Sequence, residues 1–415
     1  MKTTVSTRLI TSLSWLALGA LASLSACDGN VVGSTGTGGA PAGGSGGARV
    51  NGSGGAAVTG GGGLTGGNGA GGATVIGTGG RTTTGGGGAT AIGTGGRTTT
   101  GGAGAPGAGD TCVGAAFDPA SPPQTLTLTG NLGAHDPAAF VLGDTIYLAA
   151  TGLGAKTSTN LTAWTNGGSP LARPAWVAGM VPGATNLWAP DISFFGGMYH
   201  LYYAASTFGS NRSCIGHATR AALDAGAWAD SGAPTICSNV GTTDNWNAID
   251  PNVIVDDAGT PWLAFGSFWG GLKMIKLTDA GARADTTLLS IAARPRNGGA
   301  LEGGWIYKHC GYYYLFSSWG ACCSGAYDYN MRVGRSTAVT GPYVDKDGVA
   351  LMDGGGTLLV QGTATLTAPG HNSVIAYQGK TYNIYHALNA THGGAMLRIS
   401  ELVWDAAGWP VSGGP

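Results

Sequence analysis

Five hairpin-like segments recur along residues 111–415, and this recurrence restricts the fold more than any other feature. Each segment has a polar lead residue, a run rich in β-branched and aromatic side chains, a turn with Gly or Asp, and a second such run. Successive leads are 55, 59, 52 and 69 residues apart, and they are Asp136, Asp191, Asp250, Glu302 and His371. Helical periodicity is scarce. Four-strand repeats at such periods are typical of propeller blades, so the sequence predicts an all-β, five-bladed β-propeller.

A propeller would bring the five lead residues together. The innermost strand of each blade lines the central axis, so the residue at its start points toward the mouth of the channel. An Asp beside Pro, as at Asp136, Asp191 and Asp250, is also a common turn residue without a chemical role. Turn residues have no reason to recur at the start of successive hairpins, and the recurrence therefore favours a shared functional site.

Carboxylates that converge beside aromatic rings are typical of glycosidases. One carboxylic acid can protonate the leaving oxygen while a second carboxylate activates water, and a gap between two blades that holds this water predicts inversion. A third acid nearby raises the pKa of the general acid by like-charge repulsion. Four rings near the lead residues could stack on sugar faces or belong to the core, namely Trp188, Phe208, Phe268 and Trp269.

The stretch that precedes the hairpins has a different composition. Of the chain's 80 glycines, 36 fall within residues 29–110, where only four residues are charged. Such a segment buries too little apolar surface to offset the entropy that ordering would cost. We therefore predict a disordered Gly/Thr-rich linker over residues 28–110 and a single domain over residues 111–415.

Residues 1–27 have the pattern of a lipoprotein-type signal peptide. Lys2 and Arg8 give a charged start, and residues 13–24 form an apolar run that is short for a membrane-spanning helix. The run ends in Leu24-Ser25-Ala26-Cys27, which resembles the bacterial lipobox. An ordinary cleaved signal is the alternative. We expect an exported protein, either extracellular or a cell-envelope lipoprotein whose membrane contact is a lipid on Cys27.

The charge of the chain excludes one class of partner. The formal net charge is −1, and residues 111–415 hold 15 basic and 19 acidic residues. This balance lacks the basic excess of nucleic-acid binding proteins. We expect a neutral or weakly polar substrate, no nucleic acid, and action as a monomer.

Seven short motifs occur in the order seen in one enzyme family. They are NLGAHDP at 131–137, LWAPD at 187–191, AIDP at 248–251, LEG at 301–303, CCSG at 322–325, VGRS at 333–336 and GHNS at 370–373. Through them, the chain over about residues 112–415 resembles the arabinan endo-1,5-α-L-arabinosidases (endo-arabinanases) of glycoside hydrolase family 43. The resemblance implies a five-bladed propeller that hydrolyses α-1,5-linked arabinofuranose within arabinan, with inversion.

The resemblance also implies roles for individual residues. Asp136 would be the general base, Glu302 the general acid, and Asp250 the residue that orients the acid and tunes its pKa. The family often carries a metal, commonly calcium, in the axial channel near the His of the fifth blade, here His371. A packed or hydrogen-bonded His is the alternative at that position. No organic cofactor is expected.

The predicted substrate-binding residues surround these carboxylates. Positions that match the family's substrate cleft are Trp188, Phe208, Ser267, Phe268 and Trp269. We add Asp191 as the lead residue of the second hairpin. One turn departs from the family, in which Pro often stands two residues after the acid. Here Gly303-Gly304 follows Glu302, and we expect a looser turn.

Other activities stay open at this point. A family-43 relative could act as an exo-arabinofuranosidase or on xylan, and a blocked cleft with a monosaccharide product would distinguish it. A non-catalytic carbohydrate-binding propeller is a third alternative, which the loss of Asp136, Asp250 or Glu302 would have favoured. All three carboxylates are present. A retaining fructan hydrolase is disfavoured by the motifs around Asp136 and Glu302.

Six cysteines remain if Cys27 carries a lipid, and an even number in an exported protein permits three disulfides. They are Cys112, Cys214, Cys237, Cys310, Cys322 and Cys323. We expect Cys214 to pair with Cys237, and Cys310 with Cys322 or Cys323, because each pair falls within one blade or its loop. The adjacent Cys322 and Cys323 are hard to bond to each other.

Overall fold

The computed structural model describes residues 117–415 except 168–170, 297 and 324. The predicted signal peptide with Cys27, the predicted linker over residues 28–110, and Cys112 lie outside the described residues. In the part of the chain that is described, no helix has the length and apolarity needed to cross a membrane.

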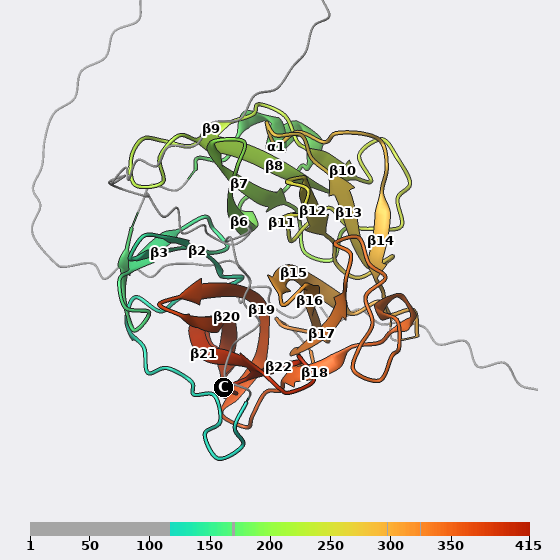
Figure 1. The fold of residues 1–415 in the computed structure, drawn as a ribbon. Coiled ribbons are helices and arrows are strands. Elements are labelled where there is room, and N and C mark those ends of the chain that lie inside the picture. The colour runs from blue at the N-terminus through green and yellow to red at the C-terminus, as the bar shows by residue number, and fades with distance from the viewer. Residues whose placement is uncertain (1–116, 168–170, 297, 324) are drawn as a thin grey trace, which may run out of the picture. The chain divides into compact units, whose positions relative to one another are not determined.

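Five sheets stand around a common centre (Figure 1), which confirms the predicted five-bladed β-propeller. The first sheet contains β1 (Thr129–Gly130), β2 (Ala138–Leu142), β3 (Thr145–Ala149), β4 (Ala155–Ser158) and β5 (Ala163–Asn166). The second contains β6 (Leu187–Phe195), β7 (Met198–Ala205), β8 (Ser213–Arg220), β9 (Ala229–Asp230) and β10 (Ile236–Ser238). The third contains β11 (Asn252–Val255), β12 (Pro261–Phe265), β13 (Leu272–Lys276) and β14 (Leu289–Ala292).

The two remaining sheets complete the ring. The fourth contains β15 (Leu301–His309), β16 (Tyr312–Trp319), β17 (Asn330–Ser336) and β18 (Thr357–Val360), and the fifth contains β19 (Leu366–Tyr377), β20 (Lys380–Asn389), β21 (Met396–Trp404) and β22 (Pro410–Ser412). Two short helices occur among the described residues, α1 (Ala175–Met180) and η1 (Leu351–Asp353). The innermost strands are β2, β6, β11, β15 and β19 (Figure 1).

Two-residue turns join the innermost strand to its neighbour in four blades, whereas five residues join β11 to β12. In three of them both residues have positive φ, which gives the turn a twist that matches the flanking strands. These turns are Gly196-Gly197, Cys310-Gly311 and Gln378-Gly379. Glycine occupies the second position each time because it adopts this conformation without steric cost. The next strand of a blade is buried on both faces, so a sequence such as YYYLFSSW in β16 is apolar almost throughout.

The segment before β2 closes the ring between the first and fifth blades. The Leu126 backbone N–H donates to the Ile399 carbonyl at 2.8 Å, and the Leu397 N–H donates to the Leu132 carbonyl at 2.8 Å. Further along, Thr129–Gly130 pairs in parallel with β5. This closure brings the start of β2 beside β19 and β20, which places groups from the first and fifth blades in one site.

Each blade has a residue with positive φ either two residues before its innermost strand or within that strand. These residues are Asp136 (54°), Ala189 (41°), Asp250 (57°), Gly303 (60°) and His371 (48°). Register shifts accompany them in β6, β15 and β19, and such bulges change the direction of nearby side chains. In three blades the positive-φ residue is the lead residue that the sequence indicated. In the other two it is a neighbour of the lead residue: Ala189 lies two residues before Asp191, and Gly303 lies one residue after Glu302.

The disulfides confirm one predicted pair and contradict the other. Cys214 is bonded to Cys237, as predicted. Cys322 is bonded to Cys323, so the expectation that Cys310 pairs with one of them was wrong. Cys310 lies in the turn between β15 and β16, whereas the adjacent pair follows the other end of β16. A strand of that length spans about 25 Å, far beyond the reach of a disulfide.

The second blade encloses a pair of buried histidines. His200 Nδ1 lies 2.8 Å from His217 Nε2, and Ser231 Oγ lies 2.9 Å from His217 Nδ1. Burial lowers the pKa of His200 to about 4. Burial and the neighbouring His200 together lower the pKa of His217 to about 4. Both rings therefore stay neutral in the folded protein at pH values where the unfolded chain takes up protons.

We expect the free energy of unfolding to fall as the pH drops from about 6.5 to about 4, because the unfolded state binds these two protons first. His217→Gln should be less stable than wild type above neutral pH, since it breaks the contact with His200, but should lose less stability over this acid range. Urea unfolding followed by tryptophan fluorescence measures both curves. Parallel pH dependences for the two proteins would contradict the assignment.

Candidate active site

Residues from all five blades line one cavity of about 370 Å³. Nine of the ten predicted site residues are among them, namely Asp136, Trp188, Phe208, Asp250, Ser267, Phe268, Trp269, Glu302 and His371. The structure therefore brings the predicted carboxylates, the predicted rings and the predicted metal residue into one space.

Asp191 is the exception, and the structure does not place it where a substrate in this cavity would reach it. Its side chain is buried, and Asn252 Nδ2 donates a hydrogen bond to its Oδ1 at 3.1 Å. Asp191 and Asn252 each follow the positive-φ residue of their blade by two positions, so both occupy the next level along their strands. Burial raises the pKa of Asp191 to about 7. Its contact joins the second blade to the third.

Asp136 receives polar groups on both carboxylate oxygens. Thr151 Oγ1 donates to Oδ2 at 2.5 Å, and His135 Nδ1 lies 2.9 Å from the same oxygen. His371 Nδ1 lies 3.0 Å from Oδ1. Burial alone would raise the pKa of Asp136, but His135 and His371 hold it well below its usual range. Asp136 is therefore ionised at neutral pH, as a general base must be.

The two imidazoles of the fifth blade that lie beside Asp136, His371 and His386, differ in charge. Burial lowers the pKa of His371, but the carboxylates of Asp136 and Asp250 outweigh it and raise the pKa to about 9. For His386, burial and the neighbouring His135 hold the pKa well below its ordinary value. His386 Nδ1 accepts a hydrogen bond from the backbone N–H of Asp136 at 3.2 Å, which is consistent with a neutral ring.

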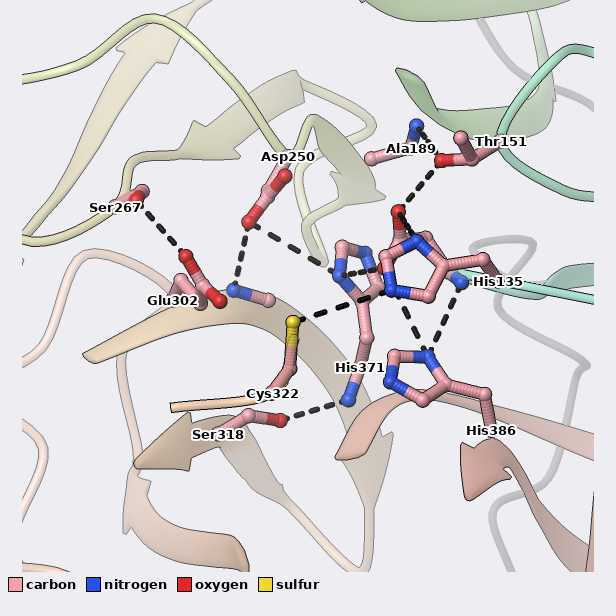
Figure 2. A network of polar contacts seen from close by, with 12 residues as sticks. His135, Thr151, Ala189, Asp250, Ser267, Glu302, Ser318, Cys322, His371 and His386 are labelled. Carbon is pink, nitrogen blue, oxygen red and sulfur yellow. Dashed lines mark hydrogen bonds and ion pairs between the residues drawn. The ribbon is translucent and has the colours of Figure 1, made fainter. Parts of the chain in front are cut away.

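Asp250 and Glu302 favour protonation. Burial raises the pKa of Asp250 to about 7, against the opposing charge of His371, whose Nδ1 lies 4.0 Å from Asp250 Oδ2 (Figure 2). Burial also raises the pKa of Glu302, against the hydrogen bond that Ser267 Oγ donates to Oε2 at 2.9 Å. The cavity thus holds one ionised carboxylate and two whose protonated forms are stabilised, an arrangement suited to paired acid and base chemistry.

The turn after Glu302 is not loose, and that expectation was wrong. The Gly303 N–H donates to Asp250 Oδ2 at 3.0 Å, which ties the two strands together. A Cβ on Gly303 would lie 3.2 Å from His371 Cα, and one on Gly304 would lie 2.9 Å from Leu272 Cδ1. At Gly303 both the positive φ and the close approach of His371 disfavour a side chain, whereas at Gly304 the near atom is the end of a flexible Leu272 side chain. The hydrogen bond from Gly303 holds the strand that carries Glu302 against Asp250.

Aromatic rings on the second and third blades border the cavity. Phe208 is 56% exposed and Trp269 is 41% exposed, whereas large apolar side chains are ordinarily buried. Phe268 and Trp269 have positive φ in the turn between β12 and β13, and the Phe268 N–H donates to the Leu301 carbonyl at 2.8 Å. The turn is thus anchored to the strand that carries Glu302, and its rings can stack on sugar faces.

The cavity contains residues that could hold a metal ion. Ligand-type atoms of His135, Asp136 and His386 all lie within 4.8 Å of one another, and His386 Nε2 is buried without a hydrogen-bond partner. Calcium prefers six to eight oxygen ligands, so two imidazoles and one carboxylate do not form a calcium cage. At His371, Nδ1 faces carboxylates, so an ion could bind this ring only at Nε2, after that nitrogen has lost its proton.

Several groups in the site were missed by the sequence prediction. Thr151 lies in the loop after β3 and reaches Asp136 only because of the fold. Tyr329 is buried, and the negative charges of Glu302 and its neighbours join burial in raising its pKa well above the usual value. His135 and the Cys322–Cys323 pair belong to motifs that the sequence analysis had identified, NLGAHDP and CCSG. Their presence in these motifs could have indicated that they lie in the site.

Comparisons with known proteins agree with this geometry. The family model of Glycosyl hydrolases family 43 matches residues 129–410. "Extracellular endo-alpha-(1->5)-L-arabinanase 1" of Bacillus subtilis is 40% identical over 66% of this chain and 86% of its own. "Extracellular exo-alpha-(1->5)-L-arabinofuranosidase ArbA" of Cellvibrio japonicus is 40% identical over 66% and 85%. A solved endo-arabinanase of Bacillus licheniformis is 41% identical, covering 69% of this chain and 99% of its own, with a TM-score of 0.64.

Gly303→Ala should lower kcat about a hundredfold, because displacing catalytic groups by about 1 Å has a cost of that order. The matched control is Gly311→Ala, which also has positive φ but whose Cβ would meet nothing within 4 Å. It should lose about 1 kcal/mol of stability and keep its kcat. Steady-state kinetics and thermal unfolding of both variants test this. Equal kcat values in the two variants would show that the close approach to His371 is unimportant.

Proposed function

The chain belongs to glycoside hydrolase family 43, and on that premise we propose that it hydrolyses α-1,5-arabinofuranosidic bonds within arabinan, with inversion of configuration. The Bacillus subtilis and Cellvibrio japonicus relatives act on α-1,5 bonds according to their names, and the solved Bacillus licheniformis structure is named an endo-arabinanase. The observation that carries the proposal is the convergence of three buried carboxyl groups in one cavity, where the pKa of Asp136 is lowered and those of Asp250 and Glu302 are raised. Inverting hydrolysis needs an ionised base and a protonated acid at the same time.

We assign the general base to Asp136. Its carboxylate stays ionised beside His135 and His371, so it can take a proton from a water molecule that attacks the anomeric carbon. Thr151 and His371 each hold a different oxygen of the carboxylate. These contacts fix its orientation, and the geometry of proton transfer depends on that orientation.

We assign the general acid to Glu302. Burial raises its pKa, which favours the protonated form that can give a proton to the glycosidic oxygen as the bond breaks. Asp250 acts through its neighbours: it accepts the Gly303 N–H next to Glu302, and the two carboxyl groups repel each other when both are ionised. We place it as the residue that orients the acid and keeps its pKa high.

An exo-acting arabinofuranosidase is the second candidate, because a relative with that name is as similar to this chain as the endo-acting one. Endo action releases a ladder of oligosaccharides from linear arabinan, whereas exo action releases a single small product from the chain end. Chromatography of early products distinguishes the two. A single product from the start of the reaction would replace the endo proposal.

Glu302→Gln should reduce hydrolysis of arabinan by about 10²–10⁴-fold, because the leaving oxygen loses its proton donor. The same variant should lose much less on an aryl arabinofuranoside, whose leaving group needs no proton. Asp136→Asn should fail on both substrates, since water must still be activated. Initial rates on the two substrates measure the difference.

Glu401→Gln is the matched control, because Glu401 lies on β21 and pairs with Lys380 at 2.5 Å, away from the residues that line the cavity. It should hydrolyse both substrates at the wild-type rate. Equal losses of Glu302→Gln on arabinan and on the aryl substrate would contradict the acid assignment.

We propose that a calcium ion binds in the axial channel at His371 Nε2, with water molecules as its other ligands. Binding would displace the Nε2 proton, so the ring would keep only the Nδ1 proton that faces Asp136. The alternative group that includes Asp136 would bind an ion through the oxygens that the base needs, so His371 is the better position. Beside the cluster of carboxylates, a bound cation would supply positive charge to the cavity. The family resemblance, rather than a protein-built cage of oxygens, supports calcium.

Calcium should raise the melting temperature of EDTA-treated wild-type protein by a few degrees, because binding to the folded state stabilises it. His371→Ala should show no such shift, and magnesium serves as the control ion. Differential scanning calorimetry measures all three conditions. A calcium shift that persists in His371→Ala would place the ion elsewhere.

Export is supported by relatives that are named extracellular. The lipid on Cys27, which the sequence pattern predicts, is proposed as the anchor, with residues 28–110 as the linker to the hydrolase domain. Action as a monomer is proposed together with them, since one chain supplies every group that the mechanism uses.

A further inference from the structure

The disulfide between the adjacent residues Cys322 and Cys323 lies in the wall of the cavity that holds the carboxylates. Both cysteines line the cavity together with His135 and Glu302. Cys323 Sγ lies 3.3 Å from His135 Nε2, and Cys322 Sγ lies 3.9 Å from the same atom (Figure 2). A bond between neighbouring residues closes no long loop, so its contribution to stability through chain entropy is small.

His135 connects this disulfide to the general base. Its Nδ1 lies 2.9 Å from Asp136 Oδ2, and its ring stacks on His386 with the centroids 4.5 Å apart. The imidazole therefore has the base at one nitrogen, sulfur at the other and a ring on its face. Its remaining exposure is to the cavity, because His135 is one of the lining residues.

The loop that carries the disulfide is itself anchored. The Ala321 N–H donates to Asp328 Oδ1 at 2.8 Å, and a Cβ on Gly320 would lie 2.6 Å from that oxygen. On the other side, Cys322 packs against a buried group that includes Tyr329 and Leu388. The fourth and fifth blades thus hold the sulfur atoms in place against a side chain of the first blade.

We propose that the Cys322–Cys323 disulfide is a positioning element that keeps the His135 ring in its orientation beside the Asp136 carboxylate. A disulfide has no proton to donate and accepts hydrogen bonds only weakly, whereas a free thiol can donate to a ring nitrogen and rotate. The bridge therefore presents a fixed surface beside Nε2, while the Asp136 carboxylate lies 2.9 Å from Nδ1 of the same ring. This inference rests on the proposed function, because Asp136 is the group through which the disulfide acts.

A double-mutant cycle with kinetics on an arabino-oligosaccharide tests the proposal. Cys322→Ala/Cys323→Ala should lower kcat about tenfold and change KM less than twofold, because the base loses alignment while sugar binding stays. In a His135→Ala background, the same two substitutions should have almost no further effect on kcat, since the disulfide then has nothing to position. Cys323→Ala alone also opens the bridge and replaces the double variant if that one fails to fold.

The matched control is Cys214→Ala/Cys237→Ala, which removes a disulfide that does not line the cavity and should keep kcat. Additive losses of kcat in the cycle, or a rise in KM at constant kcat, would overturn the positioning role and indicate direct contact with sugar in the second case. Both outcomes leave wild-type hydrolysis intact. A wild-type protein that does not hydrolyse arabino-oligosaccharides would overturn the proposed function and this inference together.

Discussion

The contact between the Asp136 carboxylate and the His371 imidazole, with 3.0 Å between the facing atoms, controls how protons are distributed in the cavity. Both groups are buried, and an isolated charge at either place would be costly. Together they are ionised, since His371 holds the pKa of Asp136 down while Asp136 holds the pKa of His371 up. The negative charge that Asp136 keeps in turn favours protonated Glu302. One ion pair thereby separates the base from the acid.

The propeller makes this contact possible by joining the two ends of the described chain. Asp136 precedes the innermost strand of the first blade, and His371 lies in that of the fifth, so the pair exists only when the ring is closed. The segment over residues 124–134 closes it with hydrogen bonds to β21 and a short pairing with β5. A residue with positive φ occurs in or just before each innermost strand, and Asp136, Asp250 and His371, three of these residues, line the cavity. Backbone strain of this kind often marks functional sites.

The sequence allowed the architecture and most of the site to be predicted, because the lead residues recur at the period of a blade. The recurrence could not locate the bulges, and a shift of one or two residues changes which side chain faces the cavity. For this reason the sequence predicted that Asp191 binds substrate, whereas its side chain is buried and accepts a hydrogen bond from Asn252 of the next blade. Proximity along the chain misled in the same way for Cys310, which lies at the far end of its hairpin from Cys322–Cys323. Gly303 is favoured because His371, from a distant part of the chain, lies close to it. A local sequence pattern cannot predict such a contact.

Proton NMR of the first products released from linear α-1,5-arabinan tests the central claim most directly, that an ionised Asp136 activates water while Glu302 protonates the leaving oxygen. The account predicts that the new reducing ends appear first as the β-anomer and only later equilibrate with the α-anomer by mutarotation. Initial appearance of the α-anomer would mean that a covalent intermediate forms, and it would contradict the division of roles between the two carboxylates.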